Sequence, residues 1–213
     1  MINKRLEIIS SFIDKNDSLA DIGCDHGYLG IMALNKGVNY VQFIDNKIGP
    51  LSSAKVNCEN INNDKIEFTL SSGLNDLNSQ VDTIAICGMG GELIVDILKA
   101  DLNKAKNLKK MILQPNKNEA KLREFLFSNG FIIIDEEIVY DKEKYYEIII
   151  AQHSANKCFY NDLDIKYGPY LRIKKSNVFI DKWNKKLNKY IIINQNNPSL
   201  YNKEIEEIRS IIK

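Results

Sequence analysis

The chain has 213 residues, and its 29 lysines and arginines nearly balance 28 aspartates and glutamates, giving a formal net charge of +1. This length suits one large domain, or a domain with an appendage, and it can bury a sizeable core without disulfides. With 44% hydrophobic and 27% charged residues, the composition excludes collagen-like and wholly disordered chains.

The sequence gives no sign of a membrane span or a metal site. No window approaches the roughly 18 consecutive apolar residues that a span requires, and the first residues lack the layout of a signal peptide. The four cysteines form no Cys-x-x-Cys pair and there are only two histidines, so we expect reduced thiols and no required metal. We therefore expect a cytoplasmic protein without a membrane partner.

Residues 1–153 alternate between helical and strand patterns. Helical spacing of apolar residues predicts helices over residues 6–13, 28–36, 50–60, 91–105 and 118–129. Short apolar runs predict strands over residues 18–22, 40–45, 65–70, 81–87, 110–114, 131–140 and 144–151. This alternation predicts an open α/β fold with a mostly parallel sheet and helices on both faces. The last two strands are separated by only three residues, so we expect a hairpin that adds an antiparallel strand.

The pattern changes after residue 153, where we place a boundary between domains 1–153 and 154–213. With Ser176 filling a gap, a first helical seam at spacings of three and four residues runs through Ile173, Ile180, Trp183, Leu187 and Tyr190. After a polar turn at residues 194–198, a second seam runs through Tyr201, Ile205, Ile208 and Ile212. Two such seams predict an antiparallel, coiled-coil-like helical hairpin. The alternative is that both seams simply pack on the α/β core.

The near-zero net charge is the sum of two opposite parts. Residues 1–153 carry 17 basic and 22 acidic residues, a net of −5, and residues 154–213 carry 12 basic and 6 acidic residues, a net of +6. Such a basic tail can bind phosphate groups, or it can be a solvated helix face in a lysine-rich chain. Eight basic residues, accompanied by one acid (Asp181), are concentrated in the tail: Lys166, Arg172, Lys174, Lys175, Lys182, Lys185, Lys186 and Lys189.

The strongest local motif is Asp21-Ile-Gly-Cys-Asp-His-Gly27, at the end of the first predicted strand. A strand ending in Asp-x-Gly and followed by a helix places backbone N–H groups at the carboxyl edge of the sheet, where open α/β folds bind ligands. The spacing differs from the dinucleotide fingerprint, and Asp25 would repel a pyrophosphate in this loop. S-adenosyl-L-methionine has no phosphate and carries sulfonium and ammonium cations, so the acids favour it. We predict donor contacts by Asp21, Gly23, Cys24, Asp25, His26 and Gly27.

The ends of the second and third predicted strands carry further candidates for donor binding. Asp45 ends the second strand 24 residues after Asp21, where an acid can accept both ribose hydroxyls, although a lone acid there can also cap the next helix. Asn46 is a second candidate for adenosine contact. Gly73 and Leu74 follow the third strand, where such folds commonly contact adenine, but Gly73 is also compatible with an ordinary turn.

The fourth and fifth predicted strands end in glycines and amides. Three glycines in four residues, Gly88-Met-Gly-Gly91, open the backbone beside the expected reactive end of the donor. We therefore add Gly88, Met89 and Gly90 to the predicted donor contacts. Gln114 and Asn116 place two amides at the same edge, where they can hydrogen-bond a nucleobase.

Five motifs occur in order along the chain: Asn3-Lys-Arg-Leu6, Ala20 to Leu29, Gly88 to Gly91, Leu113 to Asn116 and Tyr145 to Ile148. Together, over residues 1–151, they resemble the bacterial tRNA adenine-22 N1-methyltransferases, the TrmK family, and the helical tail matches that family's coiled-coil appendage in position. Cys24 and Gly27 stand where the family more often has Ser and Ala, and both are small replacements.

The resemblance implies a class I Rossmann-like methyltransferase domain, S-adenosyl-L-methionine as donor and S-adenosyl-L-homocysteine as product. It implies N1 of an adenine in the D-arm region of tRNA as acceptor, and it favours phosphate binding by the eight basic tail residues. As a hypothesis for catalysis, Asp25 stabilises the cationic product base, while Asn116 and Tyr28 orient the base. We expect a monomer.

Two other functions are compatible with the sequence. One is a methyltransferase with a different acceptor, since the donor loop alone does not identify the acceptor. The other is a non-enzymatic RNA-binding or scaffold protein with a degenerate donor pocket, against which the intact Asp21, Gly23 and Asp45 argue.

Overall fold

The computed structural model describes residues 3–61, 63–156 and 158–213, in which seven strands form one sheet in the order β3-β2-β1-β4-β5-β7-β6. Strands β1 to β5 are parallel, and β7 runs antiparallel to both β5 and β6. The predicted α/β sheet and its antiparallel hairpin are therefore confirmed. The strands are β1 (Ser18–Ile22), β2 (Tyr40–Asp45), β3 (Ile66–Leu70), β4 (Thr83–Met89), β5 (Lys110–Pro115), β6 (Phe131–Asp141) and β7 (Lys144–His153).

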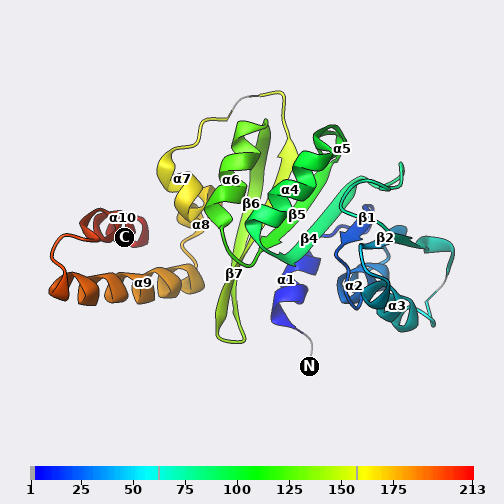
Figure 1. The fold of residues 1–213 in the computed structure, drawn as a ribbon, viewed down its shortest axis with the longest axis horizontal. Helices are drawn as coiled ribbons and strands as arrows, with labels where there is room; N and C mark the ends of the chain where they lie inside the picture. Colours follow the sequence, from blue (N-terminus) through cyan, green and yellow to red (C-terminus); the bar gives the residue numbers. More distant parts are fainter. Residues whose placement is uncertain (1–2, 62, 157) are drawn as a thin grey trace.

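Helices cover both faces of this sheet, because successive strand residues point to opposite faces and both faces are apolar. One buried cluster joins the sheet to α4, α5 and α6, and the other joins it to α1, α2 and α3. In Figure 1, α4 and α6 lie over β4 to β6. The helices are α1 (Lys4–Ser11), α2 (Tyr28–Asn35), α3 (Ile48–Asn57), α4 (Gly91–Ala100), α5 (Leu102–Asn107) and α6 (Glu119–Ser128), and a short 3₁₀ turn, η1 (Asn63–Lys65), precedes β3.

The single helix predicted over residues 91–105 is wrong, because the chain breaks at Asp101. The Asp101 side chain accepts a hydrogen bond from the backbone N–H of Lys104 at 3.0 Å and so caps a new helix, α5. Aspartate favours this capping position over a helix interior, which explains the break.

The part of the tail that the structure describes forms four helices: α7 (Asp162–Tyr167), α8 (Pro169–Lys174), α9 (Asn177–Asn196) and α10 (Asn202–Ile212). Helix α7 packs against α6 and α8 against β6, whereas Figure 1 shows α9 extending away from the sheet with α10 beside it. Apolar contacts between α9 and α10 continue onto the β6–β7 hairpin through Phe179, Leu187, Ile205, Ile208 and Ile138.

The predicted first seam is wrong at its start. Ile173 is 78% exposed, and Lys175 has a left-handed backbone (φ 44°) that ends α8. The Ser176 hydroxyl then caps α9 by accepting from the N–H of Phe179. Helix α9 also continues to Asn196, beyond the predicted start of the turn.

No helix in the described part of the chain is long and apolar enough to cross a membrane.

Candidate active site

Two adjoining cavities open at the carboxyl edge of the sheet, where the ends of the parallel strands β1, β2, β4 and β5 meet. Cavity A has a volume of about 560 Å³ and cavity B about 350 Å³. Cavity A is lined by Asn3, Arg5, Leu6, Asp21, Gly23, Cys24, Asp25, His26, Tyr28, Leu29, Cys87, Gly88, Met89 and Asn116. Cavity B is lined by Ile22, Gly23, Ile44, Asp45, Asn46, Lys47, Pro50, Ser71, Ser72, Gly73, Met89, Leu93 and Ile97.

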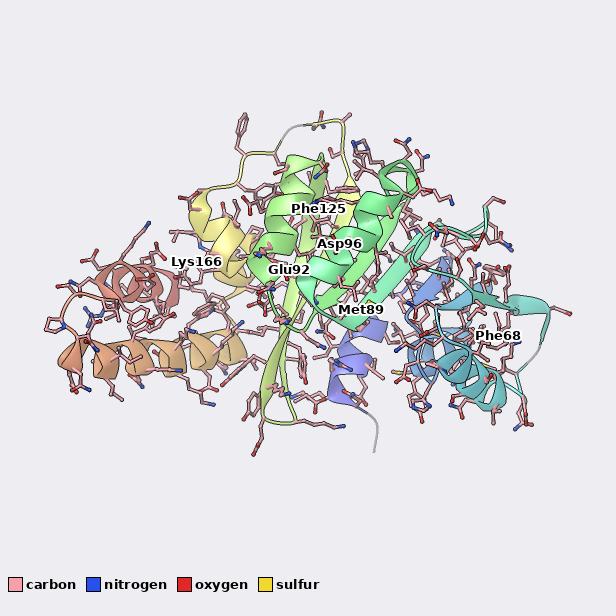
Figure 2. The ribbon with its side chains drawn as sticks, in the orientation of Figure 1. Phe68, Met89, Glu92, Asp96, Phe125 and Lys166 are labelled. Carbon is pink, nitrogen blue, oxygen red and sulfur yellow. The ribbon has the colours of Figure 1, made fainter. Side chains whose placement is uncertain are left out.

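Gly23 and Met89 line both cavities and so mark the boundary between them. Figure 2 shows Met89 where β4 passes into α4. Gly23 has a left-handed backbone (φ 71°), and a Cβ atom built on it would lie 2.0 Å from the Met89 Cε atom. A side chain at this position would strain the backbone, and the end of the flexible Met89 side chain would have to move away from it.

Asp21 places a buried carboxyl in cavity A. Its side chain is almost completely buried, and its Oδ2 atom accepts a hydrogen bond from the Gly30 N–H, near the start of α2, at 3.3 Å. Burial is the main cause that raises the pKa of Asp21 to about 7; the Gly30 hydrogen bond opposes this increase, and the neighbouring Asp45 and Asp25 carboxylates add to it. A cation entering this cavity would favour the ionised form of Asp21.

Asp25, His26 and Tyr28 surround the mouth of cavity A and are exposed. The Asp25 side chain is 73% exposed, with His26 Nε2 at 3.7 Å from its Oδ1 atom. The rings of His26 and Tyr28 stack with centroids 5.6 Å apart, and Tyr28 is 55% exposed. These groups are therefore placed to meet an incoming acceptor at the entrance.

Asp45 lines cavity B together with Asn46 and Gly73. Its Oδ1 atom also accepts a hydrogen bond from the Lys47 N–H at 2.9 Å, just before α3 begins. This bond closes a local turn before α3, whose N-cap residue is Lys47 and has no side-chain cap, so Asp45 does not cap the helix and its carboxylate lies on the cavity wall.

A hydrogen-bonded amide cluster lies beside cavity A and contributes Arg5, Gly88 and Asn116 to its lining. The buried Gln114 Oε1 atom accepts from Arg5 Nη1 at 3.0 Å and from the Gly88 N–H at 3.1 Å. Gln114 Nε2 donates to Asn116 Oδ1 at 3.2 Å, and Asn116 Nδ2 donates to the Gly88 carbonyl at 2.6 Å. The Arg5 guanidinium lies 5.0 Å from the centre of the Tyr146 ring. Arg5 thus anchors the cluster that orients Asn116.

The structure brings most of the predicted site residues to the two cavities. All three candidate catalytic residues line cavity A, and the predicted donor contacts reach one or both cavities except for Gly27, Leu74 and Gly90. Leu74 is fully buried in the core. Gly27 allows α2 to approach α3, since a Cβ atom there would lie 3.0 Å from the Ala54 Cβ atom, and Gly90 precedes α4 as its cap.

The cavity thiols belong to Cys24 and Cys87. Burial raises the pKa of both well above the usual range, and the Asp21 carboxylate adds to this effect. These two thiols are therefore neutral and line the cavity without acting as nucleophiles. Within the described ranges, no group of three or more His, Cys, Asp or Glu side chains is arranged to hold a metal ion.

Sequence reasoning assigned no function to Arg5. The only signal was its place in the Asn3–Leu6 motif, which supported the family resemblance without indicating a role.

Most of the eight basic tail residues form ion pairs. Lys166 pairs with Glu207, Arg172 with Asp164, Lys174 with Asp135 and Glu137, Lys182 with Glu147, and Lys185 with Asp181. Among the residues that the structure describes, Lys175, Lys186 and Lys189 have no such partner. The basic charge of the tail is therefore less available than the sequence count indicates.

A Rossmann-like sheet, with joined cavities at its carboxyl edge and carboxylates in place of a phosphate-binding loop, defines a class I S-adenosylmethionine-dependent methyltransferase. The family model for tRNA (adenine(22)-N(1))-methyltransferase, TrmK, matches residues 19–213, and the chain belongs to this family.

Comparison with individual proteins agrees with the family assignment. The tRNA (adenine(22)-N(1))-methyltransferase of Bacillus subtilis is 33% identical over 193 residues, covering 87% of this chain and 81% of the relative. A Streptococcus pneumoniae protein crystallised with S-adenosyl-L-methionine has a TM-score of 0.91 at 34% identity, over the whole of both chains. The M. capricolum TrmK structure with S-adenosyl-homocysteine has a TM-score of 0.85 at 26% identity, also over both whole chains.

Proposed function

We propose that this protein transfers the methyl group of S-adenosyl-L-methionine to N1 of adenine 22 in tRNA, with the donor spanning cavities A and B. Membership of the TrmK family supports the reaction. The arrangement rests on one observation: two cavities that share Gly23 and Met89, with a carboxylate in each.

The residues present fit this donor. Asp45 in cavity B would accept the ribose hydroxyls, with Asn46 and Gly73 beside the adenine. The buried Asp21 in cavity A would face the cationic methionine end, which compensates for the cost of an ionised carboxylate in a buried place. When bound, the donor supplies an electrophilic methyl group on a sulfonium.

The acceptor adenine would enter cavity A past Tyr28 and Asp25. Its N1 lone pair is blocked in a Watson–Crick pair, so the base must be unpaired or extruded from its stack. Tyr28 offers an exposed ring for stacking, and Asn116, held by the amide cluster, would orient the base edge. Good alignment of two reactants contributes roughly 7–11 kcal/mol to lowering a barrier.

Methylation at N1 makes the base cationic until its exocyclic amine loses a proton. The exposed Asp25 carboxylate at the cavity mouth would stabilise this charge. Solvent at the mouth can take the proton. Because the N1 lone pair would attack the methyl carbon directly as the bond from that carbon to sulfur breaks, no covalent enzyme intermediate is required.

The tail, residues 154–213, would bind the tRNA backbone, with the unpaired Lys175, Lys186 and Lys189 as its first contacts. One chain contains both cavities and the tail. We propose that it acts on tRNA as a monomer, in the cytoplasm.

The test is mass spectrometry of nucleosides from unmodified tRNA after incubation with the protein and donor. We expect 1-methyladenosine in tRNA with adenine 22 and none in the same tRNA with guanine at that position. Equal methylation of both tRNAs would point to another site, and methylation of neither would contradict the proposal.

A further inference from the structure

Four charged side chains form a buried network where the sheet meets α9. Arg123 from α6 and Glu136 from β6 are fully buried, and Glu147 from β7 is 1% exposed. Arg123 Nε donates to Glu136 Oε1 at 2.7 Å, and Arg123 Nη2 donates to Glu147 Oε2. Lys182 from α9 completes the network by donating to Glu147 Oε1 at 2.6 Å. Two positive and two negative charges balance. We refer to Arg123, Glu136, Glu147 and Lys182 as the junction network.

The junction network also holds α7 and α8. Glu136 Oε2 accepts from the Tyr170 N–H at 2.9 Å, at the start of α8, and Arg123 Nη1 donates to the Ile165 carbonyl of α7 at 3.4 Å. Gly168 lies between these helices, and a Cβ atom there would lie 2.6 Å from Glu136 Oε2. The turn between α7 and α8 therefore has a glycine at the position where any side chain would displace the Glu136 carboxylate.

Stability alone is a weak reason for such a network. Bringing charges out of water costs several kcal/mol per ion, and apolar residues of similar volume often stabilise a fold equally well. What this network adds is direction, because the planar Arg123 guanidinium holds the Glu136 and Glu147 carboxylates in a fixed geometry, and Lys182 must then lie beside Glu147 to pair with it. Burial raises the pKa of Glu147, but Lys182 and Arg123 outweigh it and lower the pKa to about 2. Glu147 is therefore ionised, and Lys182 is engaged with it.

A second contact between α9 and β7 lies beside the Lys182–Glu147 pair. The Tyr145 hydroxyl, two residues before Glu147 on β7, donates to Asp181, and Lys185 Nζ donates to the Tyr145 hydroxyl at 2.7 Å. Residues 145 and 147 share one face of β7, so α9 meets this strand at two neighbouring points. Two contacts fix the angle between α9 and β7, whereas a single contact would allow α9 to rotate about it.

We propose that Lys182 is a positioning residue: by pairing with Glu147 it fixes the orientation of α9 on the sheet, and so the distance from the tRNA-binding surface of the tail to cavity A. Sequence reasoning predicted Lys182 as a contact to RNA, but its side chain is only 20% exposed and is paired. This inference rests on the proposed binding of tRNA by the tail.

The test compares K182M with E147Q in the full-length protein. If Lys182 positions α9, both variants raise KM for tRNA by about tenfold or more, because two surfaces of one chain lose affinity when they cannot engage the same tRNA together. The kcat should change less than twofold, and donor affinity should be retained. The double variant is then no worse than either single variant. If Lys182 instead binds phosphate, E147Q releases it and tRNA affinity stays the same or improves, which overturns the proposal.

The salt dependence of tRNA affinity supplies a second readout, which does not require the E147Q variant to fold. K182M should leave the slope of log affinity against log salt unchanged, whereas loss of a phosphate contact would reduce that slope by about 1. K182R, which can still pair with Glu147, should restore KM toward the parent value. The matched control is K186M, on the same helix and without an ion pair, which should reduce the slope. If K186M and K189M both leave tRNA binding unchanged, the tail proposal fails, separately from the junction network.

Discussion

The buried carboxyl of Asp21 predicts a pH-dependent affinity for the donor. Burial raises the pKa of this group to about 7, and the carboxylates of Asp45 and Asp25 contribute to the increase. If the cationic donor binds beside the ionised form, affinity follows the ionised fraction, which is about 10% at pH 6 and about 90% at pH 8. Affinity should therefore rise about tenfold between these pH values.

Isothermal titration calorimetry over this range measures the effect directly. Binding at pH 7 should release about half a proton, because the bound cation lowers the pKa of Asp21. Buffers with different ionisation enthalpies report this release. D21N is the control, since it is almost isosteric but cannot ionise, so its affinity should be lower at pH 8 and its pH dependence smaller. Equal pH profiles for the parent and D21N, or affinity that falls with rising pH, would refute the role of the Asp21 charge.

Three further substitutions test other parts of the structure. G23A should weaken donor binding by tenfold or more, since it strains a left-handed backbone and displaces the Met89 side chain. The double variant G23A/M89A, measured by the same titration, should recover part of this loss. R5Q should lower kcat by about tenfold with donor affinity unchanged in equilibrium binding, because Asn116 loses its anchored orientation. G168A should reduce the free energy of unfolding by ~2 kcal/mol in urea denaturation, since the new Cβ meets Glu136.

The gathering of Asp21, Asp45 and Gly88 at the two cavities could be predicted from the sequence, because it follows from local patterns. Asp21, Asp45 and Gly88 each lie at or just beyond the end of a recognisable strand, and parallel strands bring such ends to one edge. Gly23 could be predicted for the same reason, since strand ends of this kind need glycine where the backbone turns. No knowledge of the rest of the chain is required for these inferences.

The role of Arg5 could not be predicted, because it depends on a contact across 109 residues of sequence. Helix α1 must pack on the sheet for the Arg5 guanidinium to reach Gln114. Leu74 illustrates a different limit. A turn residue after β3 can face the ligand or the core, and only the packing of α4 and α5 on this face decides that it is buried.

The number of basic residues in the tail overstates the number that are available to contact phosphate. The side chains of Lys182 and Arg172 are 20% and 24% exposed, so their ion pairs are largely protected from solvent. The side chains of Lys166 and Lys185 are 42% and 58% exposed. Exposed ion pairs are worth only ~0–1 kcal/mol, so phosphate can compete for their lysines. Lys174 is held by two acids, Asp135 and Glu137. Three unpaired and two exchangeable lysines therefore give about five contacts, where the sequence suggested eight.

This difference is measurable in the salt dependence of tRNA binding. Each phosphate contact adds roughly 0.7–0.9 to the slope of log affinity against log salt. Removing the three unpaired lysines together should lower the slope by about 2, whereas removing Arg172 and Lys182 together should not change it, even if affinity falls. A slope lowered equally by both variants would mean that the ion pairs of the free protein open on binding. The basic tail would then act through its total charge, as the composition first suggested, rather than through the few lysines that the fold leaves unpaired.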